Sequence, residues 1–261
     1  MDFYGLLKEI CSKGKDVRPR GFLTKELLGE KLIISDYNLF STPTHRSFES
    51  VSKYLWAETA WYMSGDRKPD KIVKNARMWN DIKNPDGTIN SNYGHRVFYR
   101  KNTYGITGFE FAKSCLIADE ESRNAIVPYN EPDLCWLGNK DFICTQHQRF
   151  LIRGGELICF VSLRSSDAIF GLYFNSPWWS LVHQQMFLSL LSTYPELKLG
   201  RIEVFIESSH VYERHFELVN KILSSSQEKY FIRWKELIPL NKEFEWYRDN
   251  LHDMYSVEKV A

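Results

Sequence analysis

The sequence feature that most constrains the fold is a long, largely apolar segment at residues 178–191. A helix that is apolar on all sides must be buried, so this segment predicts a central helix. The chain has 261 residues, which is enough for one large domain or two small ones. No Pro/Gly/Ser-rich linker, repeat or low-complexity tract marks a boundary, so we interpret residues 1–261 as a single domain.

The periodicity of apolar residues predicts a mixture of helices and strands. A β-hairpin is indicated where two β-rich runs flank the pair Gly154-Gly155. The helices and strands do not alternate in a regular βαβ pattern, which favours an α+β fold with one twisted, mixed sheet packed by helices. Helices are expected at residues 3–10, 48–62, 109–117, 178–191 and 211–223, and extended segments at 32–35, 125–129, 142–152, 156–164 and 202–207. The polar, turn-rich residues 80–92 predict a long surface loop.

Composition excludes several classes of function. Lys and Arg number 34 against 33 Asp and Glu, so the molecule has no overall field to hold nucleic acid or an anionic membrane. No apolar run reaches the roughly 18 residues that span a bilayer, and the first residues lack the layout of a secretory signal, so we expect a cytoplasmic protein. The five cysteines include no Cys-x-x-Cys pair, which argues against a disulfide framework and a structural metal site.

One of the cysteines is a candidate nucleophile. Cys144 lies near the start of the predicted hairpin, where a lone cysteine is ordinarily an inert core residue. Arg164-Ser165-Ser166-Asp167 ends the second strand of the hairpin, which can return close to Cys144. A nearby arginine lowers the pKa of a thiol and also binds phosphate through two hydrogen bonds. The alternative is a solvated turn with a surface ion pair.

Two other positions are chemically notable. Glu58 follows Val51 by seven residues and so places a carboxylate on the apolar face of the helix expected at residues 48–62. The carboxylate either reaches solvent or is retained for proton transfer with a raised pKa. His210 and Tyr212 stand at an expected strand-to-helix junction and share one face if the strand continues; such a pair binds a sugar hydroxyl or is structural.

Taken in order along the chain, these residues resemble the thymidylate synthase family, over about residues 18–216. Within that family, Cys144 followed by Thr145 is most similar to the phage-type deoxycytidylate hydroxymethylase branch, whereas thymidylate synthases usually have Pro-Cys-His there. The resemblance is carried by Glu58-Thr59-Ala60-Trp61, Gly65-Asp66, Trp79, Asn90-Ser91-Asn92-Tyr93-Gly94, Ser122-Arg123, Cys144, Arg164-Ser165-Ser166-Asp167, Gly171, Asn175 and His210-Val211-Tyr212.

The resemblance implies a thymidylate synthase-like domain, a homodimer formed through the sheet, and a cofactor, 5,10-methylenetetrahydrofolate. The Cys144 thiolate would add to carbon 6 of a pyrimidine nucleotide, so that carbon 5 can attack the methylene group of the folate. Glu58 would act as the acid-base group, and Tyr93 would position the water that removes the proton from carbon 5. The implied substrate contacts are Arg20, Arg164 and Ser165 to phosphate, Arg123 to the phosphate of the partner subunit, and His210 and Tyr212 to the sugar; Asp167, Trp79 and Gly171 would bind the pterin.

The same resemblance bears on base and product. Asn175 stands where uracil-specific members have asparagine and the deoxycytidylate branch has aspartate, which favours dUMP or UMP. Thr145 replaces the family histidine, Asn124 replaces an arginine, and Phe48 stands near an expected lysine. We therefore expect the added carbon to be captured by water, giving the 5-hydroxymethyl nucleotide. The alternatives are a thymidylate synthase making dTMP, a dCMP or CMP hydroxymethylase, and a non-catalytic nucleotide- or RNA-binding homologue.

Overall fold

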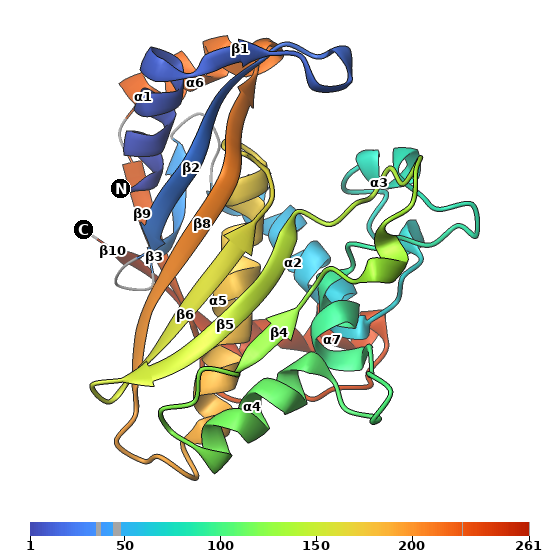
Figure 1. The fold of residues 1–261 in the computed structure, drawn as a ribbon, viewed down its shortest axis with the longest axis vertical. Helices are drawn as coiled ribbons and strands as arrows, with labels where there is room; N and C mark the ends of the chain where they lie inside the picture. Colours follow the sequence, from blue (N-terminus) through green and yellow to red (C-terminus); the bar gives the residue numbers. More distant parts are fainter. Residues whose placement is uncertain (35–37, 44–47, 226, 261) are drawn as a thin grey trace.

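The computed structural model describes residues 1–34, 38–43, 48–225 and 227–260. Its main feature is a mixed sheet of seven strands, in which β6 and β8 are parallel and most other neighbours are antiparallel (Figure 1). The strand order is β1-β2-β8-β6-β5-β4, and β7 pairs with β8. The strands are β1 (Lys15–Val17), β2 (Thr24–Ile34), β4 (Ile126–Pro128), β5 (Thr145–Arg153), β6 (Glu156–Leu163), β7 (Ser166–Asp167) and β8 (Lys198–Tyr212).

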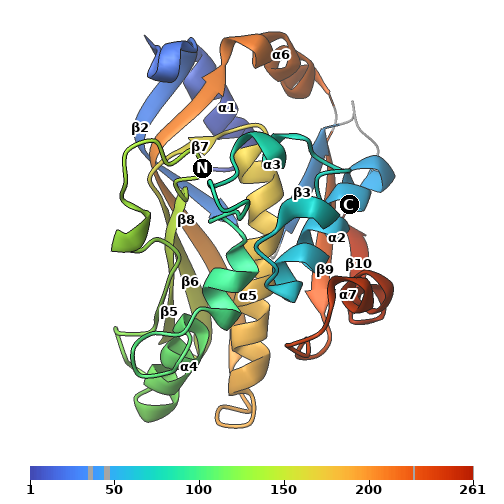
Figure 2. The ribbon, with the colours of Figure 1, turned by 90° about the vertical axis from the view of Figure 1, so that its right-hand side faces the viewer.

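A second sheet, which was not predicted, has the strand order β10-β9-β3. These strands are β3 (Asn38–Pro43), β9 (Gln227–Trp234) and β10 (Tyr255–Val260). Figure 2 shows this sheet on the opposite side of α5 (Gly171–Leu190) from the large sheet. The fold is therefore α+β, as predicted, but with two sheets rather than one.

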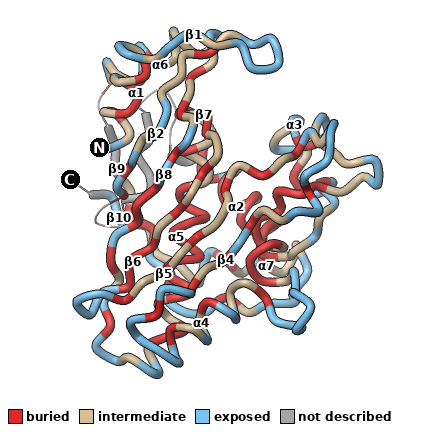
Figure 3. Tube along the Cα trace, viewed as in Figure 1, coloured by how far each residue is buried: buried red, intermediate tan, exposed pale blue. Residues whose placement is uncertain are grey.

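The central helix predicted at residues 178–191 is confirmed as α5, which begins earlier, at Gly171. It is tied to both sheets: His183 Nε2 lies 2.8 Å from the Leu157 carbonyl of β6, and Gln184 donates to the Ile232 carbonyl of β9. Figure 3 shows buried residues along α5 and the segments around it. The other α-helices are α1 (Phe3–Lys13), α2 (Phe48–Ser64), α3 (Met78–Asp81), α4 (Gly108–Ala118), α6 (Phe216–Ser224) and α7 (Phe244–Asn250).

The predicted hairpin is confirmed as β5 and β6. Its turn contains Gly154 and Gly155, whose φ angles of 58° and 75° lie in the left-handed region that glycine adopts without strain. The structure adds a register shift between Thr145 and His147, directly after Cys144. Bulges of this kind bend a strand and re-aim its side chains, often next to active sites.

Three local predictions were correct only in part. The helix expected at residues 211–223 begins only at Phe216, because β8 continues to Tyr212, which pairs with Thr24 of β2. The short strand expected at residues 32–35 is the end of the longer β2; Ser35 lies outside the described residues. The surface loop expected at residues 80–92 is buried at its end, since residues 89–92 are almost fully covered. No helix in the described part of the chain has the length and apolar character to cross a membrane.

Candidate active site

The hairpin places Cys144 beside Arg164. Cys144 directly precedes β5 and Arg164 directly follows β6, so pairing of the two strands brings them together, and the Arg164 amide donates to the Cys144 carbonyl at 3.1 Å. The guanidinium Nη2 of Arg164 lies 3.6 Å from the Cys144 Sγ, and its Nε donates to the Ile143 carbonyl at 3.0 Å. Arg164 is thereby held with its charge against the thiol.

Two arginines oppose the effect of burial on this thiol. Burial raises the pKa of Cys144, whereas the positive charges of Arg164 and Arg20 lower it. Arg20 is exposed in a tight turn with a left-handed φ of 54°, and its charge also lowers the pKa of His210. The structure therefore brings Arg20, Arg164 and Cys144 into one electrostatic cluster, in which an anionic phosphate would be stabilised.

Tyr93 is held near Cys144 by a buried carboxylate. Both backbone amides of Asn90 and Ser91 donate to Asp141 Oδ2, at 2.6 and 2.8 Å, and the Ser91 hydroxyl donates to Oδ1 at 2.6 Å. Asp141 lies three residues before Cys144, and Ser91 lies two residues before Tyr93. The carboxylate therefore joins the two segments that carry these side chains. Burial raises the pKa of Tyr93, and a thiolate at Cys144 would raise it further.

Glu58 is buried rather than solvated, with only 4% of its surface exposed. The Tyr54 hydroxyl donates to Glu58 Oε1 at 2.6 Å, and Trp79 Nε1 lies 3.3 Å from the Tyr54 hydroxyl. Tyr62 forms a second hydrogen bond to the carboxyl group. Burial raises the pKa of Glu58 to about 7, and the two tyrosine hydrogen bonds lower it less. Glu58 is therefore poised to gain or lose a proton near neutral pH.

Tyr62 connects the Glu58 and Cys144 groups. Its ring stacks on that of Tyr93, with centroids 5.4 Å apart, while its hydroxyl reaches Glu58. Tyr54, Glu58 and Tyr62 follow one another at intervals of four residues on α2, so they lie on one face of the helix. The carboxyl group and the thiol thus belong to one continuous cluster of buried side chains.

The end of β8 carries the residues expected to bind the sugar. His210 and Tyr212 do share one face, as the strand continues, and their ring centroids lie 5.1 Å apart. Ser165 Oγ lies 3.5 Å from His210 Nδ1, and Asp167 pairs in register with His210. His215 Nδ1 lies 4.0 Å from Asp167 Oδ2 and has no hydrogen-bond partner within the described residues, although it is buried.

The first turn of α5 carries the two remaining candidates on this side. A Cβ atom added at Gly171 would lie 2.9 Å from Ser166 Oγ, so a side chain there would force the strand end away. Asn175 is half-buried and follows Phe174, whose ring packs edge-on against Tyr54 at 4.9 Å. Phe174, the chain neighbour of Asn175 on α5, therefore contacts the residue that hydrogen-bonds Glu58.

Comparison with known proteins assigns the chain to a family. A family model described as thymidylate synthase matches residues 1–243. The chain belongs to the thymidylate synthase family. Similar proteins include the deoxycytidylate 5-hydroxymethyltransferases of Enterobacteria phages T6 and T4. Each is 28% identical over 220 residues, which cover 81% of this chain and 85% of the relative.

Arg123 lies apart from the cluster, although it belongs to the pattern expected of the family. It is exposed three residues before β4, and its carbonyl accepts from Arg149 at 3.2 Å. The described residues show no hydrogen bond or ion pair between the Arg123 side chain and the cluster around Cys144.

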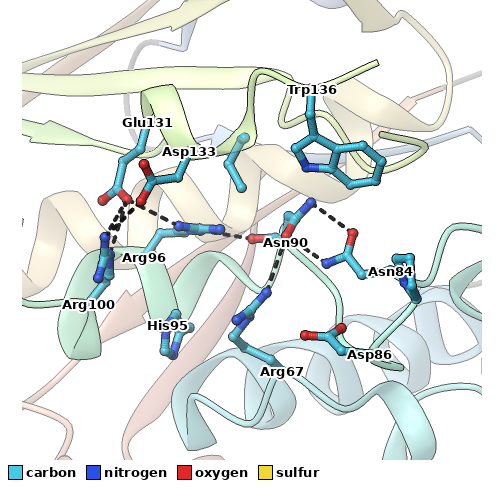
Figure 4. A pocket seen from close by; sticks show the side chains of 12 residues that line it. Arg67, Asn84, Asp86, Asn90, His95, Arg96, Arg100, Glu131, Asp133 and Trp136 are labelled. Atoms are coloured by element: carbon cyan, nitrogen blue, oxygen red, sulfur yellow. Dashed lines mark hydrogen bonds and ion pairs between the residues drawn. The ribbon is translucent and has the colours of Figure 1, made fainter. Parts of the chain in front are cut away.

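A polar cavity of about 540 Å³ is lined by charged and polar side chains that include Arg67, Asn90 and Arg96 (Figure 4). Arg67 donates to the Ile89 carbonyl, and the buried Arg96 donates to the Asn90 carbonyl and faces Glu131. Arg100 pairs with Glu131 at 3.1 Å. These arginines are already bonded to the loops around Asn90 and Glu131. We therefore infer that the network stabilises these two loops.

Sequence reasoning missed several residues of this family site. Tyr54 and Tyr62 were detectable, because they flank Glu58 at helical spacing. Asp141 and Trp179 gave no local signal, since their partners are more than 30 residues away in the chain. The described residues contain no cluster of His, Cys, Asp or Glu that could hold a metal ion.

Proposed function

We propose that this protein transfers one carbon from 5,10-methylenetetrahydrofolate to carbon 5 of a pyrimidine nucleoside monophosphate through a covalent adduct at Cys144, giving the 5-hydroxymethyl nucleotide. Membership of the thymidylate synthase family and the names of the phage relatives support a one-carbon transferase. The observation that carries the proposal is the half-buried Cys144 thiol with the Arg164 guanidinium 3.6 Å from its sulfur.

The Cys144 thiol needs positive charge because the thiolate is the nucleophile. Burial alone raises the pKa of Cys144, so the free protein keeps this group largely protonated at neutral pH. Arg164 and Arg20 favour the thiolate. With the nucleotide phosphate bound, the same two arginines and Ser165 hold the pyrimidine so that its carbon 6 faces Cys144.

Glu58 supplies and accepts protons. A pKa of about 7 gives comparable populations of acid and carboxylate at neutral pH, which is what a group serving both roles requires. Tyr54 and Tyr62 orient the carboxyl group through hydrogen bonds. We assign water-mediated proton transfer to Glu58 and the positioning of the carbon 5 water to Tyr93.

The residues expected to hold the folate fit a pterin. A pterin presents N–H groups, and Asp167 offers a carboxylate whose Oδ1 accepts from the Ile169 amide, while Oδ2 faces the unpartnered His215 Nδ1. When bound, 5,10-methylenetetrahydrofolate supplies the methylene group. Trp79 and Gly171 border this side, and the close approach of Gly171 to Ser166 keeps the end of β7 near α5.

The base is proposed to be uracil. The Asn175 amide can donate to the 4-oxygen and accept from the ring N–H of uracil, whereas a carboxylate suits the amino group of cytosine. The relatives are named deoxycytidylate 5-hydroxymethyltransferases, so a dCMP or CMP substrate is the alternative. Thymidylate synthesis is the alternative product, favoured by the same Asn175, whereas Thr145 and the hydroxymethyltransferase relatives favour water capture.

We also propose a homodimer through the open face of the large sheet. In Figure 1, strands β2, β8, β6 and β5 lie in front of α5 with no helix before them. This face carries partly exposed apolar side chains, with Phe205 44% and Ile33 37% exposed. A second copy packed there would cover them. The exposed Arg123 would then serve the phosphate site of the partner.

The test is to incubate dUMP, UMP, dCMP and CMP separately with 5,10-methylenetetrahydrofolate and to identify the products by mass spectrometry. A hydroxymethyl product with tetrahydrofolate supports the proposal. A methyl product with dihydrofolate supports a thymidylate synthase instead. If no nucleotide reacts, the protein is a binding homologue, and if Cys144→Ser keeps full activity, the covalent mechanism is wrong.

A further inference from the structure

Three buried side chains form a chain of hydrogen bonds that ends at Tyr93. Trp179 Nε1 lies 3.3 Å from Thr145 Oγ1, and Thr145 Oγ1 lies 3.3 Å from the Tyr93 hydroxyl. The backbone amide of Thr145 also hydrogen-bonds this hydroxyl. Thr145 and Trp179 are completely buried, and Tyr93 is 4% exposed, so no solvent competes for these groups.

In this chain of hydrogen bonds the Thr145 hydroxyl donates to the Tyr93 oxygen. An indole N–H donates and never accepts, so the Thr145 oxygen accepts from Trp179. The single Thr145 hydroxyl proton is then free to go to Tyr93, and the Thr145 amide is a donor as well. The Tyr93 oxygen therefore accepts from Thr145, and its own proton must point elsewhere.

The Tyr93 hydroxyl lies within electrostatic reach of the proposed nucleophile. Burial raises the pKa of Tyr93, and a thiolate at Cys144, the residue before Thr145, would raise it further. Within the part of the chain that the structure describes, we find no acceptor for the Tyr93 proton. The Tyr93 O–H is thus available to a water or substrate atom beside Cys144.

We propose that Thr145 and Trp179 are positioning residues that fix the direction in which Tyr93 donates its proton. The inference rests on the proposed function and deepens it. In the step concerned, the C5–H bond of the bound pyrimidine breaks and its proton passes to a water held by Tyr93. The electron pair of the C5–H bond forms a double bond between carbon 5 and the added carbon. The bond from the added carbon to the folate nitrogen breaks at the same time and releases tetrahydrofolate. Tyr93 holds the water for this transfer only while its proton is aimed at it.

The experiment compares two reactions of each variant. Tritium release from the 5-tritiated nucleotide reports removal of the carbon 5 proton. Adduct formation with the matching 5-fluoro nucleotide and 5,10-methylenetetrahydrofolate reports folding, binding and Cys144 attack, because fluorine is not removed as a cation. Thr145→Val is isosteric but has no hydroxyl, and Thr145→Ser restores it. Trp178→Phe is the control for Trp179→Phe, because the Trp178 indole donates to the Tyr129 hydroxyl instead.

We expect Thr145→Val to lower tritium release roughly 10- to 100-fold, while adduct formation stays within about twofold of wild type. Thr145→Ser should restore tritium release to within about threefold of wild type. The Trp178→Phe control should release tritium within the same range. Trp179→Phe should lower release less than Thr145→Val, because the freed threonine can then accept from Tyr93 or donate to it. In a Tyr93→Phe background, Thr145→Val should have no further effect.

Each outcome separates the inference from the proposed function. If wild-type protein forms no adduct with the 5-fluoro derivatives of dUMP, UMP, dCMP or CMP, the proposed function fails and the inference with it. If wild type forms the adduct but Thr145→Val releases tritium as fast as Thr145→Ser, only the inference is overturned. Equal losses of adduct and release would mean that Thr145 merely supports the fold. That result would likewise overturn the inference.

Discussion

The burial of Glu58 predicts a stability effect that can be measured without any substrate. Its pKa rises from 4.5 to about 7 in the folded protein, chiefly because burial penalises the charged form. The folded state therefore holds its proton more tightly than the unfolded state. This stabilisation is complete below about pH 4.5 and is lost as the pH rises through about 7.

The size of the effect follows from the same values. A tenfold change in proton affinity corresponds to about 1.4 kcal/mol, so the ionised carboxylate destabilises the fold by about 3 kcal/mol well above pH 7, relative to the protonated acid. Glu58→Gln mimics the neutral acid and keeps an acceptor for the Tyr54 hydroxyl. The variant should gain less than about 1 kcal/mol over wild type at pH 5 and about 3 kcal/mol at pH 9.

Urea denaturation of the two proteins at intervals between pH 5 and pH 9 measures this difference directly. Glu196→Gln, at an exposed position between α5 and β8, controls for the loss of one negative charge. In the proposed reaction Glu58→Gln should lose roughly 10²- to 10⁴-fold in turnover, as removal of an acid-base group does. If the advantage of Glu58→Gln is constant with pH, the folded protein carries the charge without penalty and the reasoning is refuted.

Three further predictions concern the same site. Arg164→Gln should raise the pKa of Cys144 further, so alkylation of this thiol by iodoacetamide, followed by peptide mass spectrometry, should need a higher pH; an unchanged profile would contradict the electrostatic role of the arginine. Asn175→Asp should move the preferred base from uracil toward cytosine, measured as the ratio of kcat/KM for the two nucleotides, and an unchanged ratio would remove Asn175 from base selection. Asp141→Asn should lower the free energy of unfolding by about 1–3 kcal/mol in urea, because its amide N–H₂ group would face backbone donors now satisfied by the carboxylate; a neutral effect would show that Asp141 does not bind the two segments together.

The sequence was most informative where partners are close in the chain. The β5–β6 hairpin, the buried α5 and the carboxylate on the inner face of α2 all follow from local periodicity and turn residues. The approach of Arg164 to Cys144 follows directly from the hairpin, since each residue flanks one of the paired strands.

The features that were missed depend on distant segments. β3, β9 and β10 form a sheet whose first strand is almost 190 residues from its neighbour β9. The predicted strand ended at residue 207 because residues 208–212 contain turn-forming and polar residues. In the structure, pairing with β2 keeps these residues extended. Asp141 accepts hydrogen bonds from two backbone amides that lie some 50 residues earlier in the chain. The roles of individual site residues still rest on the resemblance and on the proposals above.

The pairing of β2 with β8 has a consequence for how the protein acquires reactivity. Thr24, near the beginning of the chain, is aligned with Tyr212, which is among the later residues to be synthesised. Contacts between such distant segments form slowly, because the entropy of closing a long loop is lost before these contacts can stabilise the fold. A nascent or truncated chain that already contains Cys144 and Arg164 would still lack the strand that carries His210. The side chains around the thiol are therefore assembled only after the residues of β8 have left the ribosome.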